Sequence, residues 1–269
     1  MDIANYKIGI IGGGNMGRAI IKGLTESLSS PKITAWDADS NCRENLENDL
    51  QVTIAQDNRE LASNCEIIIL AVKPQIITPV VTEIADLLTE NKLLISIAAG
   101  VPCERLEKPL SNRVPTIRIM PNTPALINRG ISAIAAGRDA GEEHLAITQA
   151  IFSCLGETVI VPESSMDMVT AVSGSGPAYV FLVIEALLDA AVGIGMNREL
   201  ARTLVIETIL GSTELVKETG KQPMELKDMV TSPGGTTIAG LAELEKNGLR
   251  QAFNAALTSA CQRSQELGQ

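Results

Sequence analysis

The chain has 269 residues, a formal net charge of −10 and 45% hydrophobic residues, while aromatic residues make up only 2%. This length supports one large or two medium domains, with a core built mainly from Ile, Leu, Val and Ala. The negative charge and the scarcity of aromatic rings exclude a nucleic-acid partner, because they offer neither attraction to phosphates nor a stacking surface.

The cysteines and the apolar runs indicate the compartment. The longest uncharged run, residues 168–184, falls short of a membrane span, and the N-terminal residues lack a basic-then-apolar signal pattern. Scattered thiols without close pairs are typical of a reducing compartment. We therefore expect a cytoplasmic protein with no membrane partner. The cysteines are Cys42, Cys65, Cys103, Cys154 and Cys261.

The first part of the chain alternates short β-branched runs with helical stretches. A crossover helix is expected over residues 78–88, with Thr78 as its cap and Pro79 at its first position. Two further β segments, 131–136 and 158–161, flank a helix near 142–155. Residues 1–161 are therefore predicted to form an α/β fold, a doubly wound Rossmann-type domain with added strands. Its earlier strands are expected over 7–11, 33–36, 52–54, 67–71, 93–97 and 116–120.

The second part, residues 162–269, is predicted to be an all-helical dimerisation and substrate-binding domain. An apolar helix is expected over 166–195, broken at 174–177, and Asn197 is placed to cap the next helix, which runs to Val216. Further helices are expected over 236–246 and 248–267. Because the first helix is apolar on all sides and the helical part is small, a second copy of the chain is expected to cover it.

A glycine-rich turn follows the first expected strand. Gly12, Gly14 and Gly17 form a G-x-G-x-x-G pattern in a strand–turn–helix setting, which is typical of dinucleotide binding. Gly12 permits the tight turn, Gly14 lets the pyrophosphate approach, and Gly17 allows close contact between helix and strand. Asp37, at the end of the second strand, is placed to accept hydrogen bonds from the adenosine ribose, which favours NAD(H). A capping or turn role for Asp37 is the alternative.

Two later motifs lie at the carboxyl ends of expected strands, where open α/β sheets bind their ligands. Ala71, Val72, Lys73 and Pro74 follow the fourth strand, and Asn122 follows the sixth. Both motifs are candidates for the nicotinamide half of a cofactor. Proline after a strand is also an ordinary turn signal, so each motif alone leaves both interpretations open.

Acid–base and metal-binding groups are scarce. The single histidine, His144, lies in a polar stretch and is expected to face solvent. There is no lysine between Lys108 and Lys217, where β-hydroxyacid dehydrogenases place a general acid. One histidine and no paired cysteines offer no zinc site, so we predict no metal. A reductase without a proton donor suits a C=N bond whose nitrogen already carries its proton.

The segment VTSPGGTTIAGL, residues 230–241, runs from turn residues directly into a helix. Gly234 and Gly235 bring bare backbone N–H groups to the start of that helix, where the helix dipole also favours an anion. A carboxylate would bind there without any arginine, and Thr236 and Thr237 add hydroxyls. The alternative is that Thr236 is a plain N-cap after a turn.

Six blocks, in order, resemble the pyrroline-5-carboxylate reductase family over essentially the whole chain. They are GIIGGGNMGRAI, DNRE, LAVKPQ, RIMPNTPA, SGSGPAYVF and LKDMVTSPGGTTIAGLAELE. The resemblance implies NAD(P)H-dependent reduction of 1-pyrroline-5-carboxylate to L-proline. It also implies a homodimer through interlocked helical domains, and in many members a decamer as a ring of five dimers.

The same resemblance implies roles for single residues. Gly12, Gly14, Asn15, Met16, Gly17 and Asn58 would contact the pyrophosphate and adenosine end of the cofactor, and Ala71, Val72, Lys73, Pro74 and Asn122 would flank the nicotinamide. Ser232, Gly234, Gly235, Thr236 and Thr237 would hold the substrate carboxylate. Thr237 would also reach the ring nitrogen and is the one candidate catalytic residue.

One residue departs from the family pattern. Members that use NADPH carry a small polar or basic residue near the end of the second strand, where this chain has Asp37. Arg43 or Asn58 would still receive a 2′-phosphate if Asp37 turned away. We expect NADPH, with NADH as the alternative that Asp37 raises.

Two other functions are compatible with the sequence. A reductase of a related cyclic imino acid would share the same two-domain plan, whereas a hydroxy-acid reductase would need the missing lysine or histidine. A nucleotide sensor without turnover would have no need for the segment 232–237 that holds a carboxylate.

Overall fold

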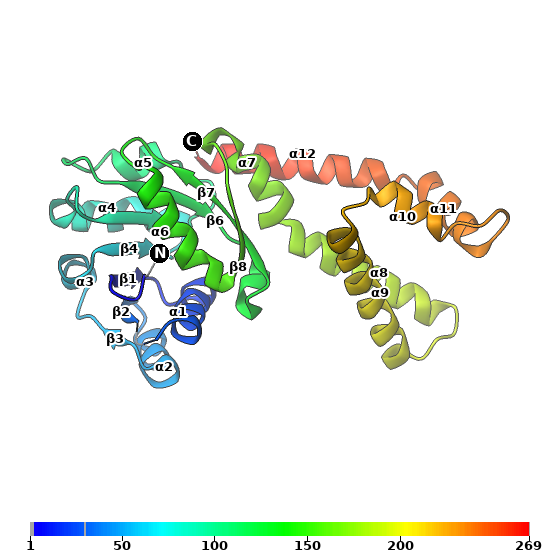
Figure 1. The fold of residues 1–269 in the computed structure, drawn as a ribbon, viewed down its shortest axis with the longest axis horizontal. Helices are drawn as coiled ribbons and strands as arrows, with labels where there is room; N and C mark the ends of the chain where they lie inside the picture. Colours follow the sequence, from blue (N-terminus) through cyan, green and yellow to red (C-terminus); the bar gives the residue numbers. More distant parts are fainter. Residues whose placement is uncertain (1–2, 30, 269) are drawn as a thin grey trace. The chain divides into compact units, whose positions relative to one another are not determined.

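The computed structural model describes residues 3–29 and 31–268. It contains an eight-stranded sheet with the order β3-β2-β1-β4-β5-β6-β7-β8 (Figure 1). Neighbouring strands are parallel except for β6 and β7, which are antiparallel. The chain order reverses between β1 and β4, as in a doubly wound sheet. The strands are β1 (Lys7–Ile11), β2 (Lys32–Trp36), β3 (Thr53–Ile54), β4 (Ile67–Leu70), β5 (Leu93–Ser96), β6 (Thr116–Met120), β7 (Gly130–Ala136) and β8 (Gly156–Ile160).

Helices cover both faces of this sheet. Alternate residues of the central strands, such as Ile69 and Leu70, point to opposite sides and enter two separate apolar clusters. One cluster also contains side chains of α1 (Asn15–Ser27), α2 (Ser40–Leu50) and α6 (Glu142–Phe152). The other contains side chains of α3 (Asn58–Asn64), α4 (Ile77–Ile84) and α5 (Cys103–Glu107). Burial on both faces explains why β4 and β5 are apolar without alternation.

The predicted strands are confirmed, with ends that shift by up to two residues. The predicted cap of the crossover helix is wrong. A 3₁₀ turn over Pro74–Ile76 leads directly into α4, so Thr78 lies inside the helix and Pro79 lies in its first turn. Proline is tolerated there because the first-turn N–H groups have no partner within the helix. The helix then ends at Ile84, and Ala85–Leu87 form another 3₁₀ turn.

The chain divides into two compact units, one of Met1–Ser175 with Ser259–Gln269 and the other of Gly176–Thr258. The first unit therefore contains the sheet, its helices and both chain ends, including the last part of α12 (Leu249–Gly268). The domain boundary predicted after Val161 stays a prediction.

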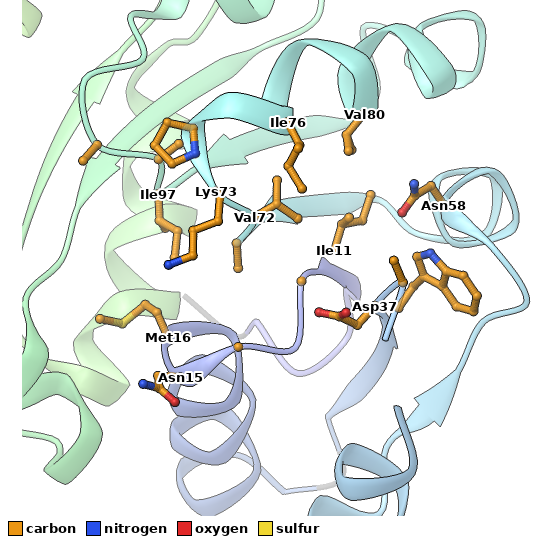
Figure 2. Close-up of a pocket in the computed structure, with 18 residues that line it drawn as sticks. Ile11, Asn15, Met16, Asp37, Asn58, Val72, Lys73, Ile76, Val80 and Ile97 are labelled. Carbon is orange, nitrogen blue, oxygen red and sulfur yellow. The ribbon is translucent and has the colours of Figure 1, made fainter. Parts of the chain in front are cut away.

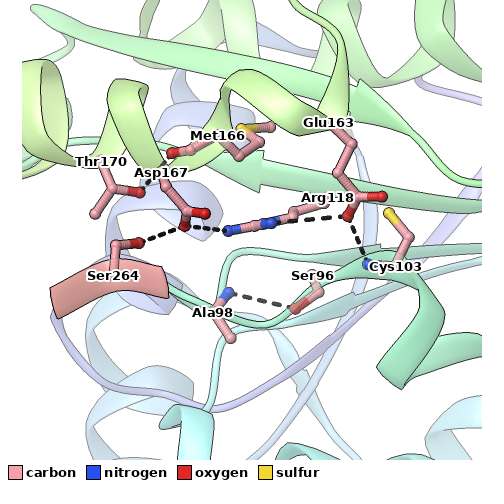
Figure 3. A network of polar contacts seen from close by, with 9 residues as sticks. All are labelled: Ser96, Ala98, Cys103, Arg118, Glu163, Met166, Asp167, Thr170 and Ser264. Atoms are coloured by element: carbon pink, nitrogen blue, oxygen red, sulfur yellow. Dashed lines mark hydrogen bonds and ion pairs between the residues drawn. The ribbon is translucent and has the colours of Figure 1, made fainter. Parts of the chain in front are cut away.

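A polar network around a buried arginine joins four segments of the first unit. The Arg118 side chain on β6 is 6% exposed and lies 3.7 Å from a Glu163 oxygen and 3.8 Å from an Asp167 oxygen. The hydroxyl of Ser264, on α12, donates a hydrogen bond of 2.6 Å to Asp167, and the Cys103 N–H donates one of 2.6 Å to Glu163 (Figure 3). A buried cation needs such partners because water no longer solvates it.

The predicted break at residues 174–177 is a local irregularity in a helical path. The chain passes from α7 (Met166–Val169) through a π-helical turn over Thr170–Gly174 into α8 (Gly176–Gly193). Pro177 sits in the first turn of α8, where a proline removes no hydrogen bond of that helix. The predicted interruption is therefore only a change in helix type.

The second unit consists of α8, α9 (Arg198–Thr219), α10 (Pro223–Met229), α11 (Thr236–Lys246) and the first part of α12. The predicted cap is confirmed, because the Asn197 side chain accepts hydrogen bonds from the N–H groups of Glu199 and Leu200. The helix α9 continues past Val216 to Thr219, and Gly220 follows it in a left-handed conformation. The short helix α10 has no counterpart among the predicted helices.

Most of α8 is exposed in the single chain. Val180, Phe181 and Leu182 are 46%, 58% and 64% exposed. The stretch Glu163–Gly193 is, by length and composition alone, apolar and long enough to cross a membrane, and only 6% of its most apolar window is buried. The predicted uncharged run 168–184 therefore belongs to a longer apolar helix, whose exposed surface needs an apolar cover.

Candidate active site

The glycine-rich turn connects β1 to α1 at the carboxyl edge of the sheet. Gly12 has a φ of +109°, and a Cβ placed on it would lie 2.6 Å from the Ala71 carbonyl oxygen. A Cβ on Gly17 would collide with the Gly12 carbonyl oxygen. In contrast, no atom of the described residues lies within 4 Å of a Cβ placed on Gly14. The first and last glycines therefore shape the turn, and Gly14 keeps the space above it free.

A cavity of about 570 Å³ opens above this turn, between the carboxyl ends of β1 and β4 (Figure 2). This is the crevice in which doubly wound sheets bind their ligands, and the volume is typical of a ligand site. Ten of the twelve predicted cofactor residues line it, and they are Gly12, Gly14, Asn15, Met16, Asp37, Asn58, Ala71, Val72, Lys73 and Pro74.

Two predicted cofactor residues lie outside the described lining of this cavity. Gly17 is buried beneath the turn, in contact with Gly12. The side-chain oxygen of Asn122 accepts a hydrogen bond of 3.0 Å from the N–H of Ile131, so this amide closes the connection from β6 to β7. The predicted contact of Asn122 with a nicotinamide stays a prediction.

Other lining residues have no counterpart among the predicted site residues. They are Ile11, Trp36, Ala38, Ile76, Val80, Ile97, Ala98 and Ala99. The segment 97–99 follows β5, the neighbour of β4, so its position after a buried strand is the signal that points to it. The remaining side chains are mostly apolar, and apolar residues at the end of a strand look like ordinary core residues in a sequence.

The Asp37 carboxylate forms the acidic end of the cavity. One oxygen accepts a hydrogen bond of 2.6 Å from the Gly13 N–H, and the other accepts one of 2.8 Å from the Asp39 N–H. Burial first, and then the charges of Asp37 and Asp39, raise the pKa of the nearby Cys42 thiol. The two N–H groups therefore fix the position of the Asp37 carboxylate on the cavity wall.

Arg43 is the cation beside this acid. Its Nη1 donates hydrogen bonds to the backbone oxygens of Asp37 and Ala38, at 2.7 and 3.0 Å. The guanidinium also lies 4.4 Å from the centroid of the Trp36 ring, which is a cation–π contact. Arg43 is thus held against β2 by three contacts and does not pair with the Asp37 carboxylate in any contact described.

The residues around the cavity fit a dinucleotide. The helix α1 starts after Gly14 with no side-chain cap and no acidic residue in its first turn, as far as the described residues show. Its first N–H groups are free to donate to phosphate oxygens, and the helix dipole favours the negative charge. In addition, the Asn58 side-chain oxygen is buried and has no hydrogen-bond partner among the described residues. A ligand with both phosphates and hydrogen-bond donors would satisfy these groups.

The second predicted binding segment lies in the other unit, at the start of α11. Gly234 has a φ of +68°, and the N–H of Gly235 donates to the Ser232 carbonyl oxygen at 3.1 Å, which makes a tight turn. Gly235 is the N-cap of α11, and the described residues provide neither a side-chain cap nor an acid in the first turn. The alternative role of Thr236 as N-cap is therefore wrong, because Thr236 is the first helical residue.

The helix start at Gly235 is open to an anion. Ser232, Gly234 and Thr236 are exposed, and Gly235 and Thr237 are half-buried. A glycine cap leaves the first N–H groups of the helix without an internal acceptor. The exposed hydroxyls and these N–H groups together form a site that suits a small carboxylate.

The single histidine, His144, contacts the backbone at the start of α6. Nδ1 of His144 accepts a hydrogen bond of 3.0 Å from the Gly141 N–H at the start of α6, and the side chain is partly buried rather than fully exposed. Among residues 3–29 and 31–268, no group of three or more His, Cys, Asp or Glu side chains is placed to hold a metal ion.

Comparisons with known proteins identify the family. Residues 163–267 match the family model described as pyrroline-5-carboxylate reductase dimerisation, and residues 7–100 match one described as NADP oxidoreductase, coenzyme F420-dependent. A pyrroline-5-carboxylate reductase from Synechocystis sp. is 47% identical over 98% of this chain and 99% of its own length. The chain belongs to the pyrroline-5-carboxylate reductase family.

Other members of the pyrroline-5-carboxylate reductase family agree with this result. The Escherichia coli protein is 41% identical over 97% of this chain and 98% of its own length. The crystal structure of a Plasmodium falciparum pyrroline carboxylate reductase with NADP bound has a TM-score of 0.91 and 35% identity, and it covers 100% of both chains. The resemblance stated from the sequence blocks, and the predicted fold class, are confirmed.

Proposed function

We propose that this protein catalyses the NAD(P)H-dependent reduction of 1-pyrroline-5-carboxylate to L-proline. The observation that carries this proposal is the full-length match to proteins named pyrroline-5-carboxylate reductase. The cavity between β1 and β4, where the strand order reverses, agrees with it. The open helix start at Gly235 supports it further, because the substrate carries one carboxylate.

The cavity in the first unit is proposed to hold the cofactor. Gly14, Asn15 and Met16 surround the pyrophosphate at the start of α1, and Asp37 and Asn58 face the adenosine half. The segment Ala71–Pro74 then lies along the nicotinamide half. When bound, the cofactor supplies a hydride. The chain's own residues provide orientation, a charge-complementary helix end and an apolar wall that excludes water.

The segment Ser232–Thr237 is proposed to hold the substrate carboxylate. The free N–H groups after Gly235 donate to its oxygens, and the hydroxyls of Ser232 and Thr236 lie beside them. Thr237, in the first turn of α11, is proposed to hydrogen-bond the ring nitrogen. Because a protonated C=N bond becomes neutral when it receives a hydride, the reaction needs no separate general acid at that step. In agreement with this, the single histidine, His144, accepts a hydrogen bond from the Gly141 N–H at the start of α6.

The exposed apolar helices are proposed to be covered by a second copy. The dimerisation model matches residues 163–267, which include α8 and its exposed side chains. Formation of a homo-oligomer follows from that match, and we propose that the dimers assemble further into a decamer. We also propose that the protein acts in the cytoplasm.

The deciding experiment is an assay of NADH and NADPH oxidation with 1-pyrroline-5-carboxylate. Turnover with either cofactor is expected, together with formation of L-proline. A parallel assay with the six-membered cyclic imino acid tests the alternative substrate, and faster turnover of that ring would replace the proposed one. Binding of a cofactor without turnover of any imino acid would favour a sensor instead.

A further inference from the structure

Asn58 faces the cavity with only half of its side-chain amide in use. Its Nδ2 donates a hydrogen bond of 2.8 Å to Oε2 of Glu83, a residue of α4. Its Oδ1 is buried and has no partner among the described residues. In Figure 2 this oxygen points toward the cavity that Asn58 lines. The amide therefore holds an unused acceptor at the wall of the cavity, which a ligand donor reaches by a small shift of the side chains that cover it.

Glu83 decides which end of this amide faces the cavity. An ionised carboxylate only accepts hydrogen bonds, so it pairs with the NH₂ end of an amide and repels the oxygen end. If the Asn58 amide turned over, Oδ1 would meet Oε2 of Glu83, and the NH₂ group would face the cavity instead. The contact of 2.8 Å therefore selects the orientation in which an oxygen faces the ligand.

Glu83 is itself held in place by Arg59, the residue that follows Asn58. Nη1 of Arg59 donates a hydrogen bond of 2.6 Å to the backbone oxygen of Glu83. The same guanidinium makes two hydrogen bonds of 2.7 Å with the Asp86 carboxylate, a bidentate arrangement that fixes its plane. Helix α3, which begins at Asn58, is thereby tied to the end of α4, and the side chain of Glu83 is set beside Asn58.

We propose that Glu83 is a positioning residue for the cofactor, because it holds Asn58 so that Oδ1 accepts a hydrogen bond from the adenosine half. The donor on the ligand is either a ribose hydroxyl or the adenine amino group. The proposal rests on the proposed function for the identity of the ligand. Glu83 itself acts only through Asn58 and makes no contact with the substrate.

The test is a fluorescence titration of the full-length protein with NADH and NADPH in the absence of substrate. Glu83→Ala is expected to raise the dissociation constant of the cofactor about five- to tenfold, as for the loss of one oriented hydrogen bond. Glu83→Gln should restore most of the affinity, because its amide oxygen still accepts from Asn58. Glu90→Ala removes an exposed acid of the same unit that lies outside the described cavity lining and makes no described contact with Asn58, Arg59 or Glu83, and we expect a change below about twofold. Circular dichroism and thermal unfolding verify that each variant is folded.

Electrostatics alone predicts the opposite sign. Removal of an acid near an anionic ligand should tighten binding, so an unchanged or lower dissociation constant for Glu83→Ala would overturn the proposal. Asn58→Ala should weaken binding by itself, and adding Glu83→Ala to it should cause no further loss. Additive losses in that double variant would show that Glu83 acts in some other way.

The two candidate donors are separated by a third titration. A reduced dinucleotide with hypoxanthine in place of adenine lacks the amino group. If Glu83→Ala loses its effect with this analogue, the amino group is the donor, and if the effect persists, the ribose is. A wild-type protein that binds neither NADH nor NADPH would overturn the proposed function together with this assignment. Wild-type binding with an unaffected Glu83→Ala would overturn the assignment alone.

Discussion

The N–H of Gly13 donates a hydrogen bond of 2.6 Å to the Asp37 carboxylate, so the glycine-rich turn and the acid at the end of β2 form one unit. A second bond, from the Asp39 N–H, holds the other oxygen at 2.8 Å. The negative charge is therefore fixed on the cavity wall. Asp37→Ser should raise kcat/KM for NADPH relative to NADH by about tenfold, because a 2′-phosphate no longer meets a like charge.

Asp39→Ser is the matched control for this prediction. Asp39 carries the same charge two residues away, but it caps α2 through the N–H of Asn41 and lies outside the described cavity lining. Its substitution should leave the ratio of the two kcat/KM values unchanged. An equal ratio in wild type and Asp37→Ser would show that Asp37 does not discriminate between the cofactors.

The glycines of the turn should respond differently to substitution. Gly14→Val places its side chain in free space, so the melting temperature should stay near that of wild type while cofactor affinity falls at least tenfold. Gly17→Ala brings a Cβ against the Gly12 carbonyl oxygen and should lower the melting temperature as well. Gly141→Ala, at another helix start with open space around it, is the control for both. Equal cofactor affinity in wild type and Gly14→Val would remove the pyrophosphate from this turn.

The strands and the glycine-rich turn were predictable because their signals are local. Runs such as Ile67–Leu70 are apolar throughout, and Gly12 and Gly17 follow the G-x-G-x-x-G spacing, in which a Cβ on either glycine would meet a backbone oxygen. The cap of α4 was not predictable in the same way. Thr78 before Pro79 is a good start signal, but the chain already turns over Pro74–Ile76, so the helix begins earlier.

Parts of the site depend on contacts between distant residues, and no local pattern reveals them. Asn58 and Glu83 are 25 residues apart, and the position of their amide and carboxylate depends on how α3 packs against α4. In the same way, the Asn122 side chain closes the β6–β7 connection through Ile131, a contact that no local pattern after a strand predicts. Only the fold distinguishes such roles.

The buried Arg118 should contribute to the stability of the first unit. Arg118→Ala leaves Glu163 and Asp167 without their cation, and Asp167 also loses a partner that positions it for the Ser264 hydroxyl. Both carboxylates keep some exposure to water, so we expect a loss of about 2–3 kcal/mol in the free energy of unfolding, measured by urea titration. Arg138→Ala removes an exposed guanidinium that lies 4.0 Å from a Glu107 oxygen and should cost less than about 1 kcal/mol. Equal losses in the two variants would contradict a special role for the buried cation.

The Cys103 thiol should make the protein less stable in alkaline solution. Burial first, and then the Glu163 carboxylate, raise the pKa of this thiol far above 9.0. Above pH 9.0 the unfolded chain releases the proton while the folded protein keeps it. The free energy of unfolding therefore falls as pH rises through this range, by about 1.4 kcal/mol per pH unit for one thiol.

Burial lowers the pKa of Lys92 below 10.5, which makes the free energy of unfolding rise with pH and opposes the effect of the thiol. The pH dependence of the wild-type protein alone therefore does not isolate Cys103. The measurement is the difference in free energy of unfolding between wild type and Cys103→Ala from pH 8 to pH 10, under reducing conditions. That difference should shrink with rising pH, whereas Cys261→Ala, which removes a thiol elsewhere, serves as the control. If that difference stays constant, the Cys103 thiol loses its proton over the same pH range in the folded and the unfolded protein, which contradicts the prediction.

The turn before α11 should control substrate affinity separately from cofactor affinity. A Cβ on Gly235 would meet the Ser232 hydroxyl, which is the end of a flexible side chain, so Gly235→Val should still fold with Ser232 displaced. We expect the KM for 1-pyrroline-5-carboxylate to rise more than about tenfold, because the valine covers the N–H groups that bind its carboxylate. The KM for NADPH should change by less than about twofold, since the cavity that we propose for the cofactor is in the other unit.

Thr237→Ala tests the proposed contact with the ring nitrogen. If the hydroxyl hydrogen-bonds the reacting ring, kcat/KM should fall by the equivalent of roughly 1–3 kcal/mol of transition-state binding. Thr219→Ala is the control, because its hydroxyl donates a hydrogen bond of 2.6 Å to the Leu215 carbonyl oxygen of its own helix. A Thr237→Ala enzyme with the kcat/KM of wild type would exclude Thr237 from the reaction and leave the helix N–H groups as the remaining binding groups at this end of α11.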